Sequence, residues 1–532
     1  MNRIIDNIKQ RISAYVPSRE QKPLFAYDPA TDGELVSFTP PEGLEEVERY
    51  WVDEPYSFIS ILFDRVEIET FYYVIEPGLN KFEKILLEDT QLILQDVLTL
   101  KGVEDLDTMD RSSVLREKAE EVLSEYTEVD ARSFEKIFYY VKRDFVEYSE
   151  ISPMMRDTYV EDIWCNGENI PIYVYHTAHG DIPSNIMFQA SDILDSFVLR
   201  IAQQSGRNLS KSSPILDTVM REGSRINITF GKEISPKGTS FSIRRQKNTP
   251  FTPIDLVAWN TFSTEMMAYF WLCVENRKNI LFCGGTASGK TSSLNAIGMF
   301  IPLNIRIVTL EDTREIQLPH KNWIPTVTRD SVSVGEVGKV DLEDLLRTSL
   351  RQRPEYLIVG EVRGRESQIL FQAMNAGHST CSTFHAGSAT EVINRFTHPP
   401  INVPPAMFSA LDVISVQTNA YDLGVEKRRA YVISEIVGVK QGVEIKDVFA
   451  WDPANDTFVY HGSGVLSDIM HRRGWDQKEL EHDLECRRTF LKTMVDKGIR
   501  DYDSVAGWIN MYHKDPETTL SALMSDMPEG MV

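Results

Sequence analysis

Short apolar runs alternate with longer segments of helical periodicity in the second half of the chain. This alternation predicts a mostly parallel sheet covered by helices, and therefore an α/β fold, over residues 256–532. Residues 429–451 then alternate apolar and polar side chains, as an antiparallel hairpin does, and the final part of the chain has helical spacing. The strands that we expect in the parallel sheet cover residues 280–283, 305–310, 356–359 and 379–383.

The first half of the chain contains two smaller patterns. Residues 50–76 alternate aromatic and β-branched side chains and predict strands, whereas residues 81–148 have helical spacing among many charges. We therefore expect residues 1–150 to form an α+β region with a helical bundle. Residues 151–246 mix short strands with one helix and predict a smaller α/β domain. Residues 247–255 contain two prolines and predict a linker to the second half.

The first turns of the chain form a separate amphipathic pattern. Four isoleucines recur there at helical spacing beside three basic residues. We expect a helix that docks on its own domain, and a helix that contacts a partner or a membrane is the alternative. The isoleucines are Ile4, Ile5, Ile8 and Ile12.

Composition narrows the class of protein. The 532 residues carry a formal net charge of −23, which disfavours nucleic acid and anionic lipid as direct partners. No apolar run approaches the ~18 residues of a membrane span, so we expect a cytoplasmic protein. The five cysteines form no C-x-x-C pair, so we expect no zinc site.

A phosphate-binding loop stands between an expected strand and an expected helix. The sequence GGTASGKT at residues 284–291 fits the pattern G-x-x-x-x-G-K-[ST]. Its backbone N–H groups and the helix N-terminus would hold phosphate oxygens, Lys290 would reach the β- and γ-phosphates, and Thr291 would ligate Mg²⁺. We therefore expect a bound nucleoside triphosphate. The residues that we assign to it are Gly284, Gly285, Thr286, Ala287, Ser288, Gly289, Lys290, Thr291 and Ser292.

Two acidic clusters follow the loop, each at the end of an expected strand. The first, residues 307–315, ends in three carboxylates, and the second, residues 356–363, resembles a Walker B strand. Gly360 occupies the place of the usual aspartate, so Glu361 is expected to carry the Mg²⁺ role through a bound water. The base position is then open, and Glu315 is the best candidate for it.

Two histidines, His378 and His385, lie at the two ends of the next expected strand. A histidine pair without further ligands is more often structural than metal-binding. Their position behind a phosphate loop and two acidic clusters favours a functional interpretation, because ligands bind at the carboxyl ends of strands in open α/β sheets.

This order of motifs resembles the secretion ATPase superfamily of type II and type IV systems, and is most similar to its archaeal branch. Segments that look like archaellum motor ATPase sequence are REGSRI at 221–226, GKEI at 231–234, KGTSFSIR at 237–244, LRQRPEY at 350–356 and GIRDY at 498–502. The resemblance covers about residues 45–515. It identifies the superfamily more specifically than it distinguishes an archaellum ATPase from an archaeal adhesion-pilus ATPase.

The resemblance implies a RecA-like ATPase domain with a smaller N-terminal domain, assembled as a homo-hexamer with ATP and Mg²⁺ at subunit boundaries. It implies that Glu315 polarises the attacking water, that Glu361 organises Mg²⁺, and that His378 and His385 sense the nucleotide state. It also implies a polytopic membrane platform protein and accessory cytoplasmic motor proteins as partners, with the chain peripheral at the inner face of the membrane.

A basic segment in the smaller domain is a candidate source of cations for the transferring phosphoryl group. Residues 221–247 contain seven basic and two acidic residues in a strongly acidic chain, and Arg225 and Arg244 lie in expected strands. An arginine so placed is worth about 10³–10⁵ in rate, and the family uses N-terminal-domain arginines in this way. The alternative is a solvated basic strand edge.

The motifs and the resemblance together lead us to expect an ATP-hydrolysing motor that powers the assembly or rotation of an archaeal type IV pilus-like filament, with the archaellum as the first candidate. This expectation has three rivals. An adhesion-pilus or secretion ATPase has the same chemistry. A nucleic-acid translocase is disfavoured by the acidic charge and by the lack of a basic and aromatic channel signature. A scaffold that senses nucleotide without hydrolysis is disfavoured by the set of Lys290, Glu315 and Glu361.

Overall fold

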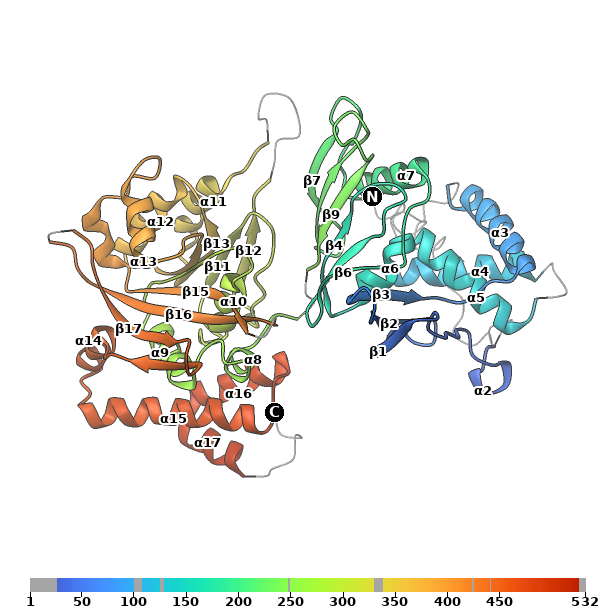
Figure 1. Cartoon of the computed structure of the whole chain (residues 1–532). Helices are drawn as coiled ribbons and strands as arrows, with labels where there is room; N and C mark the ends of the chain where they lie inside the picture. Colours follow the sequence, from blue (N-terminus) through green and yellow to red (C-terminus); the bar gives the residue numbers. More distant parts are fainter. Residues whose placement is uncertain are drawn as a thin grey trace, which may run out of the picture. The chain divides into compact units, whose positions relative to one another are not determined.

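The structure is a computed structural model of the whole chain, and contacts divide it into two compact units, Met1–Lys247 and Asn248–Val532. Each unit is described by itself below, with the labels of Figure 1. The helix predicted at Ile4 to Ile12 lies outside the described residues. The structure describes residues 26–99, 108–124, 129–246, 249–329, 338–422, 425–440 and 442–525.

The first unit begins with a three-stranded antiparallel sheet and a group of three helices. Strand β2 is almost entirely buried, while β1 has many exposed positions. The three helices pack on one another around Leu94, Leu115 and Phe138, as the helical spacing predicts. The elements are α2 (Pro29–Asp32), β1 (Leu44–Asp53), β2 (Ser57–Asp64), β3 (Glu69–Ile75), α3 (Lys81–Thr99), α4 (Thr108–Leu123) and α5 (Ala131–Phe145).

The rest of the first unit is a six-stranded antiparallel sheet of order β6-β5-β4-β9-β8-β7 with helix α7 packed on it. Its apolar core continues into the three-stranded sheet, because Ile59, Tyr72 and Val74 belong to the same buried cluster as Phe197 and Ile243. The elements are η2 (Ser149–Ile151), α6 (Ser152–Arg156), β4 (Val160–Cys165), β5 (Tyr173–His176), β6 (Gly180–Pro183), α7 (Ser191–Gln204), β7 (Ile215–Val219), β8 (Arg225–Thr229) and β9 (Ser240–Arg244).

The second unit is built on a nine-stranded sheet of order β12-β11-β13-β14-β10-β15-β16-β17-β18. The strands from β12 to β15 are parallel, and β15 to β18 are antiparallel, so the predicted α/β fold and the antiparallel hairpin are confirmed. The strands are β10 (Ile280–Gly284), β11 (Ile307–Glu311), β12 (Trp323–Val327), β13 (Tyr356–Val362), β14 (Ser379–Phe384), β15 (Val413–Asp422), β16 (Val425–Gly438), β17 (Glu444–Asp452) and β18 (Thr457–Tyr460).

Helices cover this sheet, and the chain ends in a helical group. The first of them begins at Pro253 with a capping box from Thr252, so the end of the segment expected as a linker is already helical. The helices are α8 (Pro253–Ala258), α9 (Thr264–Glu275), α10 (Lys290–Gly298), α11 (Leu342–Ser349), η3 (Leu350–Gln352), α12 (Glu366–Asn375), α13 (Ala389–Thr397), η4 (Pro405–Ala410), α14 (Gly464–Arg473), α15 (Gln477–Asp496), α16 (Tyr502–Lys514) and α17 (Pro516–Met524).

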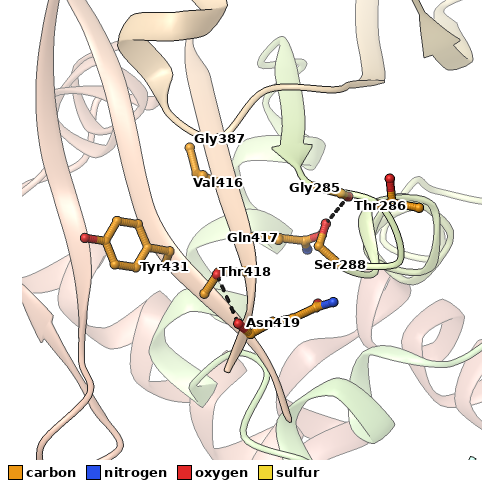
Figure 2. A pocket seen from close by; sticks show the side chains of 9 residues that line it. All are labelled: Gly285, Thr286, Ser288, Gly387, Val416, Gln417, Thr418, Asn419 and Tyr431. Carbon is orange, nitrogen blue, oxygen red and sulfur yellow. Dashed lines mark hydrogen bonds between the residues drawn. The ribbon is translucent and has the colours of Figure 1, made fainter. Parts of the chain in front are cut away.

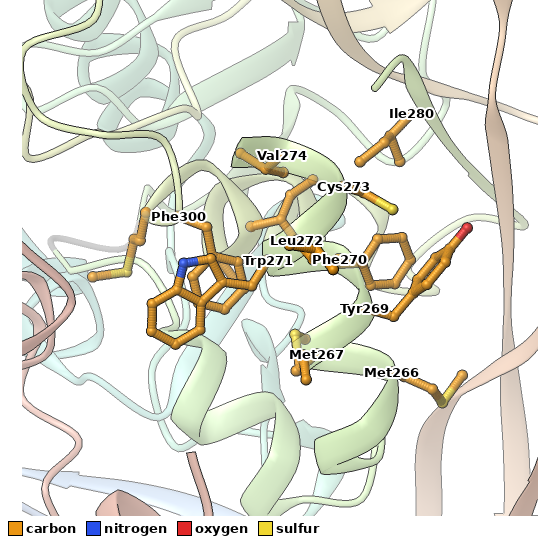
Figure 3. Packing of buried hydrophobic residues seen from close by; sticks show 14 of the residues in the cluster. Met266, Met267, Tyr269, Phe270, Trp271, Leu272, Cys273, Val274, Ile280 and Phe300 are labelled. Carbon is orange, nitrogen blue, oxygen red and sulfur yellow. The ribbon is translucent and has the colours of Figure 1, made fainter. Parts of the chain in front are cut away.

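Helix α9 is the centre of the larger core of the second unit (Figure 3). Its residues from Met266 to Val274 are all buried, which is typical of a helix covered on every side. Trp271 stacks on Phe300 with ring centroids 4.7 Å apart, and the Arg487 guanidinium of α15 lies 5.1 Å from the Trp271 ring. The C-terminal helices are therefore anchored to the core of the second unit. In the part of the chain that the structure describes, no helix is long and apolar enough to cross a membrane.

Candidate nucleotide site

The phosphate loop joins β10 to α10, as its motif predicts. Gly284 has φ +154° and Gly289 has φ +88°, and Ala287 also lies in the left-handed region at +58°. A Cβ on Gly284 would lie 2.6 Å from the carbonyl oxygen of Gln417, so only glycine fits there. The loop then leads directly into α10, whose N-cap is Gly289.

The start of α10 is suited to an anion. Gly289 is the N-cap and makes no side-chain cap hydrogen bond, so the first N–H groups of this helix have no side-chain acceptor from that position. Lys290 Nζ donates to the carbonyl oxygens of Gly284 at 3.1 Å and Gly285 at 2.5 Å. The ammonium is thus held inside the loop, where a phosphate group would meet it. These residues fit a nucleoside triphosphate.

The order of the strands places the acidic residues on one flank of the loop. Strand β14 lies between β10 and β13, and β11 lies beyond β13. Because these strands are parallel, their carboxyl ends meet at the same edge of the sheet as the phosphate loop. Near the end of β13, Glu361 accepts a hydrogen bond from Arg363 at 2.5 Å, and Arg363 also lies 3.8 Å from Asp312.

Glu311 is the functional candidate that sequence reasoning missed. It ends β11, is 2% exposed, and its Oε1 accepts the backbone N–H groups of Glu315 and Ile316, both at 2.8 Å. Its Oε2 has no hydrogen-bond partner among the described residues. Burial raises the pKa of this carboxyl from 4.5 to about 7. A side chain on Gly360 would meet Glu311, since a Cβ there would lie 3.1 Å from its Cγ.

The missing Walker B aspartate therefore has a steric reason. The space beside the end of β13 is occupied by Glu311 from the neighbouring strand, so a side chain at position 360 would require Glu311 to shift. The three carboxylates at the end of β11 could not be ranked from the sequence, because burial is what distinguishes Glu311 from Asp312 and Glu315.

Glu315 is exposed and lies in the loop after β11. Its backbone is fixed on both sides, because its N–H donates to Glu311 and its carbonyl oxygen accepts from Asn295 of α10 at 3.0 Å. Glu311 therefore accepts from the backbone of Glu315 and not from its side chain, which is exposed. The loop that carries it is tied to the same helix that follows the phosphate loop.

The two histidines occupy different places. His385 follows β14 at the sheet edge of the site, and its Nε2 lies 3.2 Å from the hydroxyl of Thr286 in the phosphate loop. His378 precedes β14, and its Nδ1 lies 3.1 Å from the carbonyl oxygen of Pro354. Seven residues of strand span about 23 Å, so within one chain only His385 reaches the loop. If His378 senses the nucleotide, it does so at a place other than the phosphate loop of its own chain.

Arg225 and Arg244 lie side by side in the first unit. They face each other across β8 and β9, on exposed positions of the sheet. Arg225 forms a bidentate pair with Asp217 at 2.7 and 2.9 Å, and Arg244 lies 3.4 Å from Asp162. The Arg225–Asp217 pair is solvent-exposed and therefore costs little to break, whereas in the second pair only 21% of the Asp162 side chain is exposed.

The described residues contain no group of three or more histidine, cysteine, aspartate or glutamate side chains that could hold a metal ion. Mg²⁺ is usually bound by one or two protein oxygens together with substrate phosphates. Thr291, at the start of α10, and Glu361, near the end of β13, stay the predicted Mg²⁺ residues. Four of the five cysteines are buried, and burial raises the pKa of the Cys381 thiol to about 12.

Comparison with known proteins places the motifs in a family. Residues 150–441 match the family model described as "Type II/IV secretion system protein". Residues 6–78 and 454–528 match the models "PilB3-like, N-terminal" and "PilB3-like, C-terminal". The three matches together cover most of the chain.

Individual relatives and solved structures are also similar to this chain. Protein MJ0900 of Methanocaldococcus jannaschii is 37% identical over 485 residues, which are 86% of this chain and 87% of that protein. The type IV secretion system protein VirB11 of Bartonella henselae is 27% identical over 37% of this chain and 64% of its own length. Among solved structures, the ATPase DotB of Legionella pneumophila is 16% identical, with a TM-score of 0.39 over 66% of this chain and 92% of its own. The chain belongs to the type II/IV secretion system family of ATPases, as the order of its motifs predicts.

Proposed function

We propose that this protein is an ATP-hydrolysing motor that drives the assembly of a type IV pilus-like filament. The observation that carries the proposal is the sheet edge at which a complete phosphate loop, Glu361 and the acidic end of β11 meet. The family supplies the context of a membrane-associated secretion or pilus machine.

The residues of the site divide the chemistry among them. Lys290 and the N–H groups at the start of α10 hold the β- and γ-phosphates, and Thr291 with Glu361 positions Mg²⁺. When bound, Mg²⁺ neutralises the negative charge that develops on the transferring phosphoryl group. To meet Mg²⁺, Glu361 would give up the hydrogen bond that it accepts from Arg363.

Glu315 is our candidate for the group that orients the attacking water. Its carboxylate is exposed and can reach a water, whereas the neighbouring Glu311 is 2% exposed and its Oε1 already accepts two backbone N–H groups. Glu311 instead holds the loop of Glu315 through two backbone N–H groups. We assign Glu311 a positioning role.

The motor is proposed to work as a hexameric ring at the inner face of the membrane. Arg225 and Arg244 would supply cations to a nucleotide in the ATP-site domain, after exchanging Asp217 and Asp162 for phosphate oxygens. A polytopic platform protein with a basic cytoplasmic face suits the net charge of −23. That contact should weaken as salt rises.

Two filaments fit this proposal, the archaellum and an archaeal adhesion pilus. The archaellum is the first expectation from the sequence, and it stays a prediction. The matches at both ends of the chain to PilB3-like models favour the pilus alternative.

Filament formation in the native organism tests the proposal. A chromosomal Glu315→Gln substitution should leave the protein present and abolish one class of surface filament, seen by electron microscopy. Glu343→Gln is the matched control, because Glu343 is an exposed carboxylate of α11 that pairs only with Arg347 among the ion pairs of this helix. Unchanged pili and archaella in the Glu315→Gln strain would reject a filament motor.

A further inference from the structure

The β15–β16 hairpin extends past the phosphate loop. Strand β15 pairs with β10 only as far as Gly284 with Gln417, which is where the loop begins. Its pairing with β16 continues for five more residues, to Asp422 with Val425. The outer part of the hairpin therefore forms a wall beside the loop.

A cavity of about 320 Å³ lies between this wall and the loop (Figure 2). Its size suits a small ligand or part of one. A β-bulge shapes the wall here, because Val416 pairs with Val432 and Gln417 with Ala430, which leaves Tyr431 as the extra residue. Bulges often occur next to active sites. The lining residues are Gly285, Thr286, Ser288, Gly387, Val416, Gln417, Thr418, Asn419 and Tyr431.

Two carboxamides of the wall have polar atoms without partners. In Figure 2, the side chains of Gln417 and Asn419 extend to the same side of β15, toward the phosphate loop. Gln417 is 2% exposed and its Nε2 donates to Ser293 of α10, but its Oε1 has no acceptor role in the described structure. The buried Oδ1 of Asn419 likewise has no donor among the described residues. A buried acceptor without a donor costs about 1–3 kcal/mol, which a ligand donor would recover.

The wall also reaches over the loop. Arg428 pairs with Asn419 across the two strands, and its Cδ would lie 3.5 Å from a Cβ placed on Gly289. The hairpin is thus close enough to contact a nucleotide that the loop holds.

The position of the carboxylates decides which end of the nucleotide meets the wall. Glu361 and Glu311 lie on the β14 side of β10, whereas the cavity is lined mainly by the loop and by β15, with Gly387 as its single lining residue from the loop after β14. Mg²⁺ bridges the β- and γ-phosphates, so the γ-phosphate belongs on the carboxylate side. The nucleoside must then lie on the side of the hairpin.

We propose that this cavity binds the nucleoside and that Asn419 selects its base by accepting a hydrogen bond from an exocyclic amine. Adenine carries such an amine. Guanine presents a carbonyl oxygen at the same ring position, so it would pair with Asn419 only after the carboxamide turned over to present Nδ2. This inference rests on the proposed function, because it assumes a nucleotide on the phosphate loop.

Binding of three Mg²⁺-loaded probes to the full-length protein tests the inference by titration calorimetry: ADP, GDP and inorganic tripolyphosphate. The wild type should bind ADP at least about tenfold more tightly than GDP. Asn419→Ala should weaken ADP by roughly 3- to 10-fold and leave tripolyphosphate within about twofold. Asn419→Leu, which keeps the volume of the side chain without the amide, should act in the same direction. Asn455→Ala is the matched control, since Asn455 is exposed in the β17–β18 turn and does not line the cavity.

Two results would overturn the inference while leaving the nucleotide site intact. One is equal affinity of the wild type for ADP and GDP. The other is a loss of tripolyphosphate binding in both Asn419 variants that equals their loss of ADP binding, because the wall would then act on the phosphates. A wild type that binds none of the three probes would instead reject the proposed function.

Discussion

Replacing Glu311 by glutamine should change how stability depends on pH. In the folded protein, burial raises the pKa of this carboxyl from 4.5 to about 7. A group whose pKa is raised by folding contributes stability that is fully present below the unfolded value and is lost as pH rises through the folded value. The wild type should therefore lose stability between pH 4.5 and 7, with little further change above.

The expected magnitude follows from the two pKa values. The difference between 4.5 and about 7, at about 1.36 kcal/mol for each pH unit, sets an upper limit of about 3 kcal/mol. Glutamine keeps an oxygen for the N–H groups of Glu315 and Ile316 and does not ionise. For a unit of this size, a gain of about 3 kcal/mol in the free energy of unfolding of Glu311→Gln relative to the wild type corresponds to roughly 6 °C in Tm.

Differential scanning calorimetry without nucleotide and with a chelator measures the effect. The Tm of Glu311→Gln minus that of the wild type should rise by about 6 °C from pH 5 to pH 8. Glu343→Gln, an exposed carboxylate of the same unit, should show no such rise. A Tm difference for Glu311→Gln that is constant over this pH range would refute a protonated, buried Glu311.

Three further predictions concern the core and the site. Arg487→Met should destabilise the second unit by about 3 kcal/mol. The substitution leaves the buried Glu275 carboxylate, whose pKa Arg487 helps to lower to about 2 against the effect of burial, with His513 at 2.9 Å and Arg473 at 3.5 Å as its remaining partners. Adding Glu275→Gln should recover most of the loss in thermal unfolding. Glu315→Gln should keep ATP binding and lose turnover, whereas Glu361→Gln should raise the Mg²⁺ concentration needed for activity; a larger metal defect in Glu315→Gln would exchange the two roles. Mixing Arg244→Ala subunits with Glu315→Gln subunits should restore some phosphate release if the arginine acts across a subunit boundary, and no recovery at any ratio would place it within its own subunit or outside the reaction.

The parallel strands of the second unit could be predicted because they are buried on both faces. Strands β10 and β13 read as continuous apolar runs between glycines and polar residues, which is the pattern of a covered parallel sheet. Strand β12 was missed because it is an edge strand with a proline, Pro325, in its middle. Strand β15 was missed because its outer half is polar, and that half is the wall beside the phosphate loop.

The sequence predicts those parts of the candidate site that stand in short, local motifs. The phosphate loop, Glu361 and His385 stand in recognisable short patterns, and the structure brings all three to one edge of the sheet. The role assigned to Glu311 depends on a contact with Gly360, about 50 positions away, and the role proposed for Asn419 depends on a cavity that it shares with Thr286 and Ser288, about 130 positions away. No local pattern carries that information, because burial and missing partners are properties of the packed sheet.

Phosphate release by the purified protein with ATP and Mg²⁺ tests the central claim most directly. The wild type should hydrolyse ATP, and Lys290→Ala should abolish turnover and weaken nucleotide binding, because it removes the side-chain cation of the phosphate loop. Lys321→Ala, at an exposed position of the same unit, should match the wild type. Normal turnover in Lys290→Ala would contradict the assignment of this loop as the site of ATP hydrolysis.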